Sequence, residues 1–316
     1  MTKTHRKLTP TAVLQLIAPH TWVAAVAPVL TGTALSIGLG DLTPRTFFAD
    51  LITPLIAVLM LVCACAAQSA VNTLNDYVDF RKGTDTADNC VDETDAAIIY
   101  HNLDPKSALG VAIGCLVVAL AAGITVVVLC GNLFVLVMGL VGLVAVVGYS
   151  CGPTPISYLP LGEVVSGGVM GIIITLATYL ALTGHLGWLA AAASLPAFIT
   201  IALIMQVNNT SDIARDIQAG RRTLPIYLGE SRSAAMIAAG NVVALSIELI
   251  LTLALWRFGA PIIVAAACLS YHNIKLLAAG PYNAQTRPRN MRAIVRQAAI
   301  INFLFALAIL LGAHFR

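Results

Sequence analysis

Two segments of this chain place carboxylates at the spacing of one helical face. The first contains Asp76 and Asp79 within the sequence NTLNDYVDFRKGTD, and the second contains Asp212 and Asp216 within QVNNTSDIARDIQAGRRTL. Residues three or four positions apart are neighbours on a helix. Each segment therefore presents a pair of carboxylates toward one point, provided that it is helical.

The two segments share further residues at matching positions. An Asn lies seven residues before the last Asp of each pair, and a Gly lies four residues after it. These residues are Asn72 and Gly83 in the first segment and Asn209 and Gly220 in the second. A glycine at that place lets a helix end. We interpret residues 68–85 and 206–224 as an internal duplication, or as convergence on one task.

Paired carboxylates of this kind favour a bound cation. Two unit charges 4 Å apart repel by about 4 kcal/mol at an effective dielectric constant near 20. Oxygen ligands without Cys or His favour Mg²⁺ over zinc or copper, and Mg²⁺ commonly shares its ligands with substrate phosphates. Basic side chains that suit phosphate oxygens follow the carboxylate pair in both segments, at Lys82, Arg221 and Arg222. The pattern predicts a Mg²⁺-bridged diphosphate.

The remaining acidic residues of this region have no such pattern. Seven of the 15 acidic residues lie between residues 68 and 97: Asp76, Asp79, Asp85, Asp88, Asp92, Glu93 and Asp95. We assign Asp85 to the metal site and interpret the last four as part of a solvated loop, so the role of 86–97 stays open. The seven cysteines are scattered without a C-x-x-C pair, which indicates packing rather than metal binding.

The elements that must position these residues are membrane helices. The chain has 316 residues, of which 59% are hydrophobic and 10% charged, as in polytopic membrane proteins. A net charge of +3 and scattered aromatic residues argue against nucleic-acid binding and leave lipid and small molecules as partners. Nine apolar runs have the length of a membrane-spanning helix. They are residues 14–39, 47–72, 107–130, 132–150, 160–183, 186–207, 234–256, 258–280 and 293–313.

The fold class that follows is an all-α bundle of about nine transmembrane helices, in a single domain over residues 1–316. With the N-terminus in the cytoplasm, 15 of the 18 Lys and Arg residues fall on the cytoplasmic side, as the positive-inside rule requires. The polar connections 73–106 and 208–233 then open on that side as well. No cleaved signal peptide is expected, because the first apolar run lacks an A-x-A site. Glu248 lies inside a span, and its role stays open.

Three motifs together resemble the UbiA superfamily of intramembrane prenyltransferases, and within it the 1,4-dihydroxy-2-naphthoate polyprenyltransferases of menaquinone synthesis. The pattern N-x-x-N-D-x-x-D-x-x-x-G-x-D is filled by Asn72, Asn75, Asp76, Asp79, Gly83 and Asp85. The pattern N-N-x-x-D-x-x-x-D-x-x-x-G-[KR]-x-T-L is filled by Asn208, Asn209, Asp212, Asp216, Gly220, Arg221, Thr223 and Leu224. A third stretch matches Y-x-x-G-P-x-P-[IL]-x-Y-x-x-L-G-E through Tyr149, Gly152, Pro153, Pro155, Tyr158, Leu161, Gly162 and Glu163.

This resemblance implies the substrates and the residue roles. It implies a polyprenyl diphosphate donor, whose tail runs between helices, and an aromatic acid acceptor that loses CO₂ to give demethylmenaquinone. The implied metal-site residues are Asn72, Asp76, Asp79, Asp85, Asn208, Asp212 and Asp216, with the four paired Asp residues catalytic. The implied substrate-binding residues are Asn75, Lys82, Arg221, Arg222, Tyr149 and Tyr158. The two tyrosines are equally compatible with an interfacial aromatic belt, and Glu163 with a helix-dipole partner.

Two other classes of protein fit parts of the sequence. A cation transporter also pairs carboxylates from repeated halves, but it places them near the middle of the membrane. A lipid-binding membrane module would not need two complete Asp motifs. Within the enzyme class, the alternative acceptors are an isomeric dihydroxynaphthoate, 4-hydroxybenzoate, homogentisate and a haem vinyl group.

Overall fold

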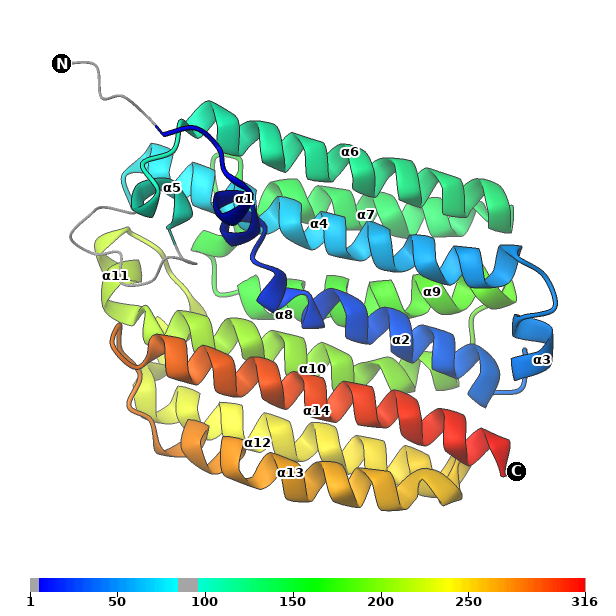
Figure 1. Cartoon of the computed structure of the whole chain (residues 1–316). Coiled ribbons are helices and arrows are strands. Elements are labelled where there is room, and N and C mark those ends of the chain that lie inside the picture. Colours follow the sequence, from blue (N-terminus) through cyan, green and yellow to red (C-terminus); the bar gives the residue numbers. More distant parts are fainter. Residues whose placement is uncertain (1–5, 85–95, 316) are drawn as a thin grey trace.

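The computed structural model describes residues 6–84 and 96–315. They form a bundle of long helices whose axes are roughly aligned (Figure 1). The long helices are α2 Val23–Gly38, α4 Ile52–Lys82, α6 Pro105–Cys130, α7 Leu133–Ser150, α10 Trp188–Ser211, α12 Leu224–Leu255, α13 Ala260–Ala279 and α14 Arg287–His314. One further span is formed by α8 Gly162–Ser166, the π-helical segment η3 Gly167–Ile173 and α9 Ile174–Thr183. The short elements are α1 Pro10–Ile17, η1 Pro19–Thr21, α3 Pro44–Phe47, α5 Ala97–Tyr100, η2 Ile156–Tyr158, α11 Ile213–Gln218 and η4 Arg257–Gly259.

The predicted number of spans is confirmed for the described residues. Eight helices are long and apolar enough to cross a membrane, and the pair formed by α1 with η1 and α2, bent by 50°, makes the ninth. Each predicted apolar run overlaps one of these spans. Large apolar side chains point outward, for example Val128 (73% exposed) and Val144 (71% exposed). In a lipid environment such faces are solvated by hydrocarbon rather than by water.

The first acidic motif lies on a continuous helix, as predicted. Helix α4 runs ten residues past the predicted end of its apolar run at residue 72 and stops at Gly83, whose φ of 72° favours glycine. One helix therefore carries both the membrane span and the carboxylates of the first motif.

The second motif does not lie on one continuous helix, so the condition for Asp212 and Asp216 to share a helical face is not met. Helix α10 ends at Ser211, and Asp212 (φ −107°, ψ 10°) separates it from α11. The hydroxyls of Thr210 and Ser211 donate to the carbonyls of Gln206 and Val207, at 2.6 and 2.9 Å. Such side-chain bonds to the preceding turn bend a helix and weaken its continuation. The second motif therefore turns at Asp212 instead of following the axis of α10.

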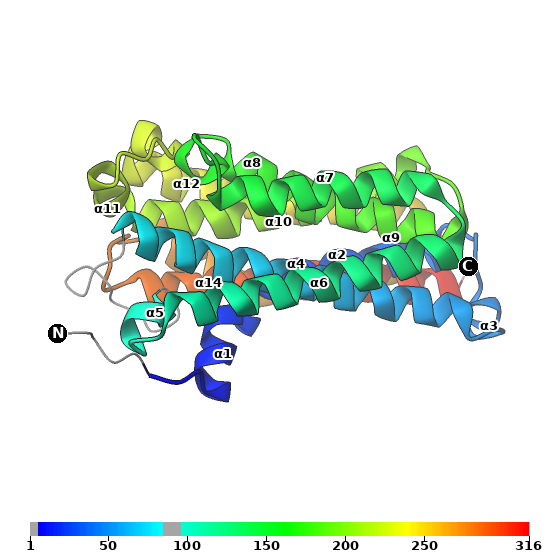
Figure 2. The same ribbon diagram turned by 90° about the horizontal axis from the view of Figure 1, so that it is seen from above.

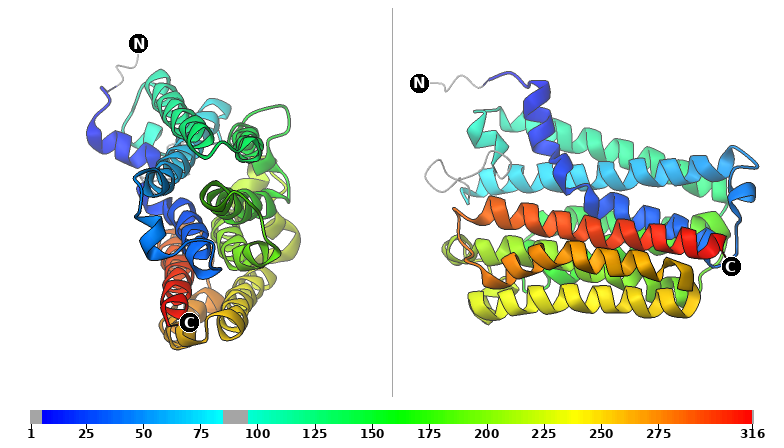
Figure 3. Two further views of the ribbon diagram at one scale, coloured as in Figure 1. Left: turned by 90° about the vertical axis from the view of Figure 1, so that its right-hand side faces the viewer. Right: turned by 60° about the horizontal axis from the view of Figure 1, so that its bottom comes forward.

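The spans form a ring with an outer layer on one side. Seen along the helix axes, α2, α4, α7, the α8–η3–α9 span, α10 and α14 surround a central region, and α12 and α13 pack outside α10 and α14 (Figure 3). The view from above shows α1 projecting from the bundle (Figure 2). The last turns of α4 and the short helix α11 lie at the same end of the bundle, opposite α3 (Figure 1).

Glycines allow the α8–η3–α9 span to approach α10 closely. A Cβ added at Gly167 would lie 2.5 Å from the Phe198 carbonyl oxygen, and one at Gly171 would lie 2.4 Å from the Phe198 nitrogen. Small residues permit such backbone contact between membrane helices. The close approach brings the start of this span beside the second acidic motif.

Candidate active site

The two acidic motifs meet through Arg221. Its Nη2 lies 2.6 Å from Asp79 Oδ1, and its Nη1 lies 3.4 Å from Asp216 Oδ1. Asp79 and Asp216 are 5% and 2% exposed, although 137 residues separate them in the sequence. The structure therefore brings the two motifs together, and a guanidinium group lies between the two carboxylates.

A second arginine contact was not expected from the sequence. Arg287, the first residue of α14, places its Nε 3.2 Å from Asp212 Oδ2 and donates from Nη2 to Asn208 Oδ1 at 2.7 Å. Arg215 Nη2 contacts the same Asp212 oxygen at 2.9 Å. The motif spacing gives no sign of Arg287, because it lies far along the chain among several other arginines.

The amides of the first motif hold neighbouring elements. Asn75 donates to Asp79 Oδ2 at 3.2 Å and accepts from the Ser150 hydroxyl at 3.0 Å, which ties α4 to the end of α7. Asn72 donates to Thr21 Oγ1 at 2.9 Å, beside the break between α1 and α2. Asn72 thus fixes this break, and its role as a metal ligand stays a prediction.

Tyr158 lies against the basic residues of the two motifs. Lys82 Nζ lies 4.5 Å and Arg221 Cζ 5.2 Å from the centre of the Tyr158 ring. The backbone nitrogen of Arg222 donates to the Tyr158 carbonyl at 2.9 Å, while the Arg222 side chain is exposed. Tyr158 therefore makes cation–π contacts at the site, which favours the active-site interpretation over an interfacial belt.

Glu163 also belongs to the site. It is 2% exposed, and its Oε1 accepts a hydrogen bond from Asn209 Nδ2 at 2.9 Å. Its Oε2 is buried and has no hydrogen-bond partner among the described residues. Nearby, Tyr149 donates from its hydroxyl to Met205 Sδ at 3.0 Å. Of the two interpretations of Glu163, this contact with the second motif favours the active-site one.

Asp216 lies where a cation would stabilise it. Burial raises the pKa of Asp216 from its ordinary value to about 6, Arg221 opposes that shift, and the Asp212 charge adds to it. The Thr223 hydroxyl donates to Asp216 Oδ2 at 3.1 Å. A further positive charge beside this carboxylate would favour its ionised form.

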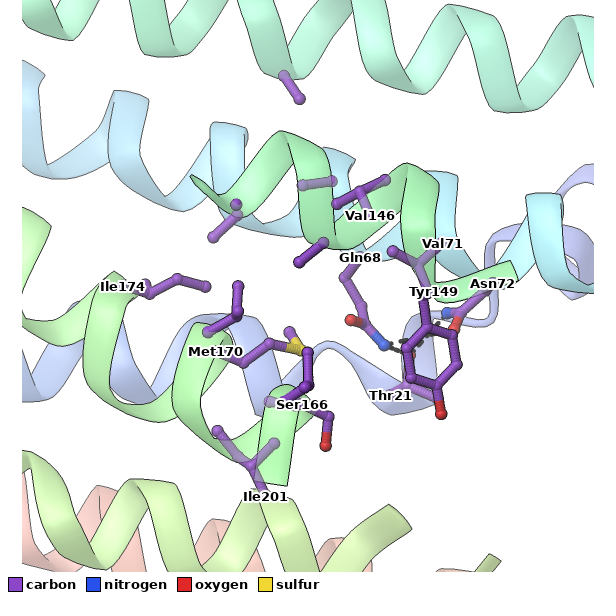
Figure 4. A pocket seen from close by; sticks show the side chains of 18 of the residues that line it. Thr21, Gln68, Val71, Asn72, Val146, Tyr149, Ser166, Met170, Ile174 and Ile201 are labelled. Carbon is purple, nitrogen blue, oxygen red and sulfur yellow. Dashed lines mark hydrogen bonds between the residues drawn. The ribbon is translucent and has the colours of Figure 1, made fainter. Parts of the chain in front are cut away.

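A large cavity extends from the acidic motifs into the bundle. Its volume is about 830 Å³, within the range of sites that bind small molecules. Polar residues line the end at the motifs: Asn72, Asn75, Asp76, Asn208, Asn209, Arg221 and Arg287. The remainder is mainly apolar, and Figure 4 shows Val146, Met170 and Ile174 along it, together with the polar lining residues Tyr149, Asn72 and Thr21. The cavity thus joins a charged end to an apolar channel.

These residues fit a Mg²⁺ ion that binds together with a phosphate ligand. Over residues 6–84 and 96–315, no three His, Cys, Asp or Glu side chains converge closely enough to hold a metal ion. Mg²⁺ is usually held by one or two carboxylates with water and substrate phosphates, and the motifs supply pairs of Asp residues with amide oxygens beside them. Asp85 and most of the segment 86–97 lie outside the described residues.

Comparison with known proteins identifies relatives along most of the chain. The model of the UbiA prenyltransferase family matches residues 25–295. The 1,4-dihydroxy-2-naphthoate octaprenyltransferase of Bacillus subtilis (strain 168) is 32% identical over 73% of this chain and 70% of its own length. The protein of the same name in Escherichia coli (strain K12) is 28% identical over 95% of both chains.

A solved structure shows the same fold. The UbiA homolog from Archaeoglobus fulgidus bound to GPP and Mg²⁺ superposes with a TM-score of 0.65 over 95% of this chain and 99% of its own, at 18% sequence identity.

Proposed function

The chain belongs to the UbiA prenyltransferase family and is an aromatic prenyltransferase, and we propose that it transfers a polyprenyl group from a polyprenyl diphosphate to 1,4-dihydroxy-2-naphthoate. The reaction requires Mg²⁺, releases diphosphate and CO₂, and gives demethylmenaquinol, the reduced form of demethylmenaquinone. The observation that carries this proposal is the meeting of two remote Asp motifs at the charged end of one long apolar cavity. The acceptor follows the names of the bacterial relatives.

The charged end suits the diphosphate of the donor. Asp76, Asp79, Asp212 and Asp216, with Asn72, Asn208 and Asp85, are the proposed Mg²⁺ ligands, directly or through water. When bound, Mg²⁺ supplies positive charge that stabilises the departing diphosphate. Arg221 and Arg287 contact the carboxylates without substrate, and their guanidinium groups can bind phosphate oxygens. We assign Asn75, Lys82 and Arg222 to the same anionic group.

The apolar part of the cavity suits the prenyl chain and the cation that forms from it. An apolar wall keeps water away from the allylic carbon as its bond to diphosphate breaks. The ring of Tyr149 lines the cavity next to the motifs (Figure 4), and an aromatic face stabilises a nearby cation. The acceptor ring carbon attacks that cation. Loss of CO₂ from this carbon then restores aromaticity without a protein base.

The proposed sidedness rests on the distribution of charge. The motifs lie at the end of the bundle opposite α3, which contains Arg45, one of the few basic residues assigned to the outer side. We propose that the motif end faces the cytoplasm, together with the N-terminus.

The decisive experiment is product analysis with purified protein. The protein is incubated with Mg²⁺, prenyl diphosphates of several lengths, and separate aromatic acids: 1,4-dihydroxy-2-naphthoate, an isomeric dihydroxynaphthoate, 4-hydroxybenzoate and homogentisate. Mass spectrometry should show prenyl gain with loss of the carboxyl group for the first acid, and none when EDTA replaces Mg²⁺. Preferred prenylation of another acceptor, or full activity in EDTA, would overturn the proposal. Asp76→Asn and Asp212→Asn should each abolish turnover.

A further inference from the structure

Two arginines of α14 line the cavity without taking part in the acidic network. Arg292 and Arg296 lie one helical turn apart, and both side chains are exposed to the cavity or its mouth. Within residues 6–84 and 96–315 neither forms an ion pair or a side-chain hydrogen bond, whereas Arg215, Arg221 and Arg287 each contact a motif carboxylate. The cavity therefore has two positive charges that the described protein does not balance.

These arginines line the same cavity as the segment that joins α1 to α2. Helices α2 and α14 are neighbours that run in the same direction (Figures 1 and 3). Near their far ends Gly38 faces Ile309, since an added Cβ would lie 2.3 Å from Ile309 Cγ2. Arg292 and Thr21, which precede this contact on the two segments, both line the cavity, and Thr21 contacts Asn72.

The position of the pair differs from that of the diphosphate-binding arginines. Along α14, a rise of 1.5 Å per residue places the Cα atoms of Arg292 and Arg296 about 7.5 and 13.5 Å beyond that of Arg287. Side chains on a helix tilt toward its N-terminus, so both guanidinium groups reach back toward the motif end. They can contact a group next to the reacting carbon, while Arg287 and Arg221 remain with the acidic motifs.

The ligand chemistry that fits is a carboxylate on a planar ring. Burying a ring against the apolar wall is favourable, but burying its carboxylate is costly unless a charged partner binds it. Arginine binds a carboxylate through two parallel hydrogen bonds. We propose that Arg292 and Arg296 bind the carboxylate of the aromatic acid acceptor and so set the preference for an acid. This inference rests on the proposed function.

Steady-state kinetics of charge-neutral variants test the assignment. Arg292→Gln, Arg296→Gln and the double variant are compared with Arg232→Gln, an exposed arginine on α12 that does not line the cavity. The KM for the acid should rise about tenfold or more in the double variant, since hydrogen bonds to charged groups contribute that much. The KM for prenyl diphosphate should not change, and Arg232→Gln should match the wild type. Arg292→Lys and Arg296→Lys, which keep the charge but lose the planar fork, should have intermediate values.

A binding comparison separates the carboxylate from the rest of the ring. Competition binding of 1,4-dihydroxy-2-naphthoate and of 1,4-dihydroxynaphthalene, which lacks the carboxylate, is measured on wild type and double variant. Wild type should prefer the acid, and the double variant should lose that preference while keeping its affinity for the carboxylate-free ring. Equal loss of affinity for both ligands would overturn the proposal, as would a rise in the KM for the prenyl diphosphate.

An anionic lipid headgroup is a second source of negative charge that Arg292 and Arg296 could bind. The kinetics are therefore repeated in phosphatidylcholine vesicles with and without phosphatidylglycerol. A variant effect that depends on phosphatidylglycerol, with an unchanged KM for the acid, would assign the pair to lipid and overturn the proposal. If wild-type protein does not prenylate the naphthoate at all, the proposed function fails. If wild type is active and the variants keep its KM for the acid, only this inference fails.

Discussion

At the scale of single residues, negative and positive side chains alternate in space across the site. Asp79, Arg221 and Asp216 form one series, and Arg215, Asp212 and Arg287 form another. Each of these three buried carboxylates therefore has a positive partner before any substrate binds. We expect an exchange of partners on binding, in which the carboxylates would hold Mg²⁺ and the arginines would bind the phosphate oxygens.

Replacing Arg221 tests this exchange. Arg221→Gln leaves Asp79 and Asp216 without the cation between them and removes a phosphate ligand. Breaking a buried ion pair costs about 3–5 kcal/mol, so kcat/KM for prenyl diphosphate should fall by about a hundredfold or more. The measurement is donor kinetics at saturating acceptor. Arg221→Lys should recover part of the loss, and wild-type kinetics in Arg221→Gln would contradict the assignment.

Glu163 provides a second test, because charge and hydrogen bonding can be separated there. Glu163→Gln keeps an oxygen that can accept from Asn209, whereas Glu163→Leu leaves that buried donor unpaired. An unpaired buried polar group costs about 1–3 kcal/mol. If Glu163 only positions Asn209, the Gln variant should stay close to wild type and the Leu variant should lose about tenfold or more in kcat/KM. An equally inactive Gln variant would show instead that the negative charge of Glu163 is required.

At the scale of elements, the packing of the α8–η3–α9 span on α10 holds Glu163 against the second motif. Gly171→Ala forces a methyl group into the backbone of Phe198, at 2.4 Å from its nitrogen. Overpacking costs about 1–3 kcal/mol or more, so thermal unfolding in detergent should shift to lower temperature and activity should fall. Gly168→Ala is the matched control, because an added Cβ there meets no atom within 4 Å. Equal stability of the two variants would contradict this account.

The sequence predicts elements better than it predicts contacts between them. The apolar runs located all nine spans, and the position of Gly83 gave the end of α4, because both depend on local composition and backbone freedom. The turn at Asp212 was missed, since it depends on whether the hydroxyls of Thr210 and Ser211 bond back to the helix. Arg287 was missed as well. Its contact with Asp212 joins elements 75 residues apart and exists only after α14 has packed against α10.

At the scale of the whole molecule, the site changes from charged to apolar along the direction of the helices. The carboxyl end of α4, with the first acidic motif, and the short helices α5 and α11 lie at one end of the bundle, while α3 lies at the other (Figure 1). The cavity follows the same axis from the charged end into apolar surroundings. A donor with a charged head and a long apolar tail matches this gradient, because each part meets the environment that solvates it.

The orientation of this axis in the membrane can be measured with single cysteines. Gln218 lies on α11 at the motif end, and Phe48 follows α3 at the other end; both are exposed, and each is replaced by cysteine in a separate variant. If the motif end faces the cytoplasm, a membrane-impermeant maleimide added to intact cells should label Phe48→Cys and spare Gln218→Cys. In inverted membrane vesicles the pattern should reverse. The parent chain supplies the background labelling of its native cysteines. Labelling of Gln218→Cys in intact cells would place the site on the outer face, and the diphosphate donor would then have to arrive from outside.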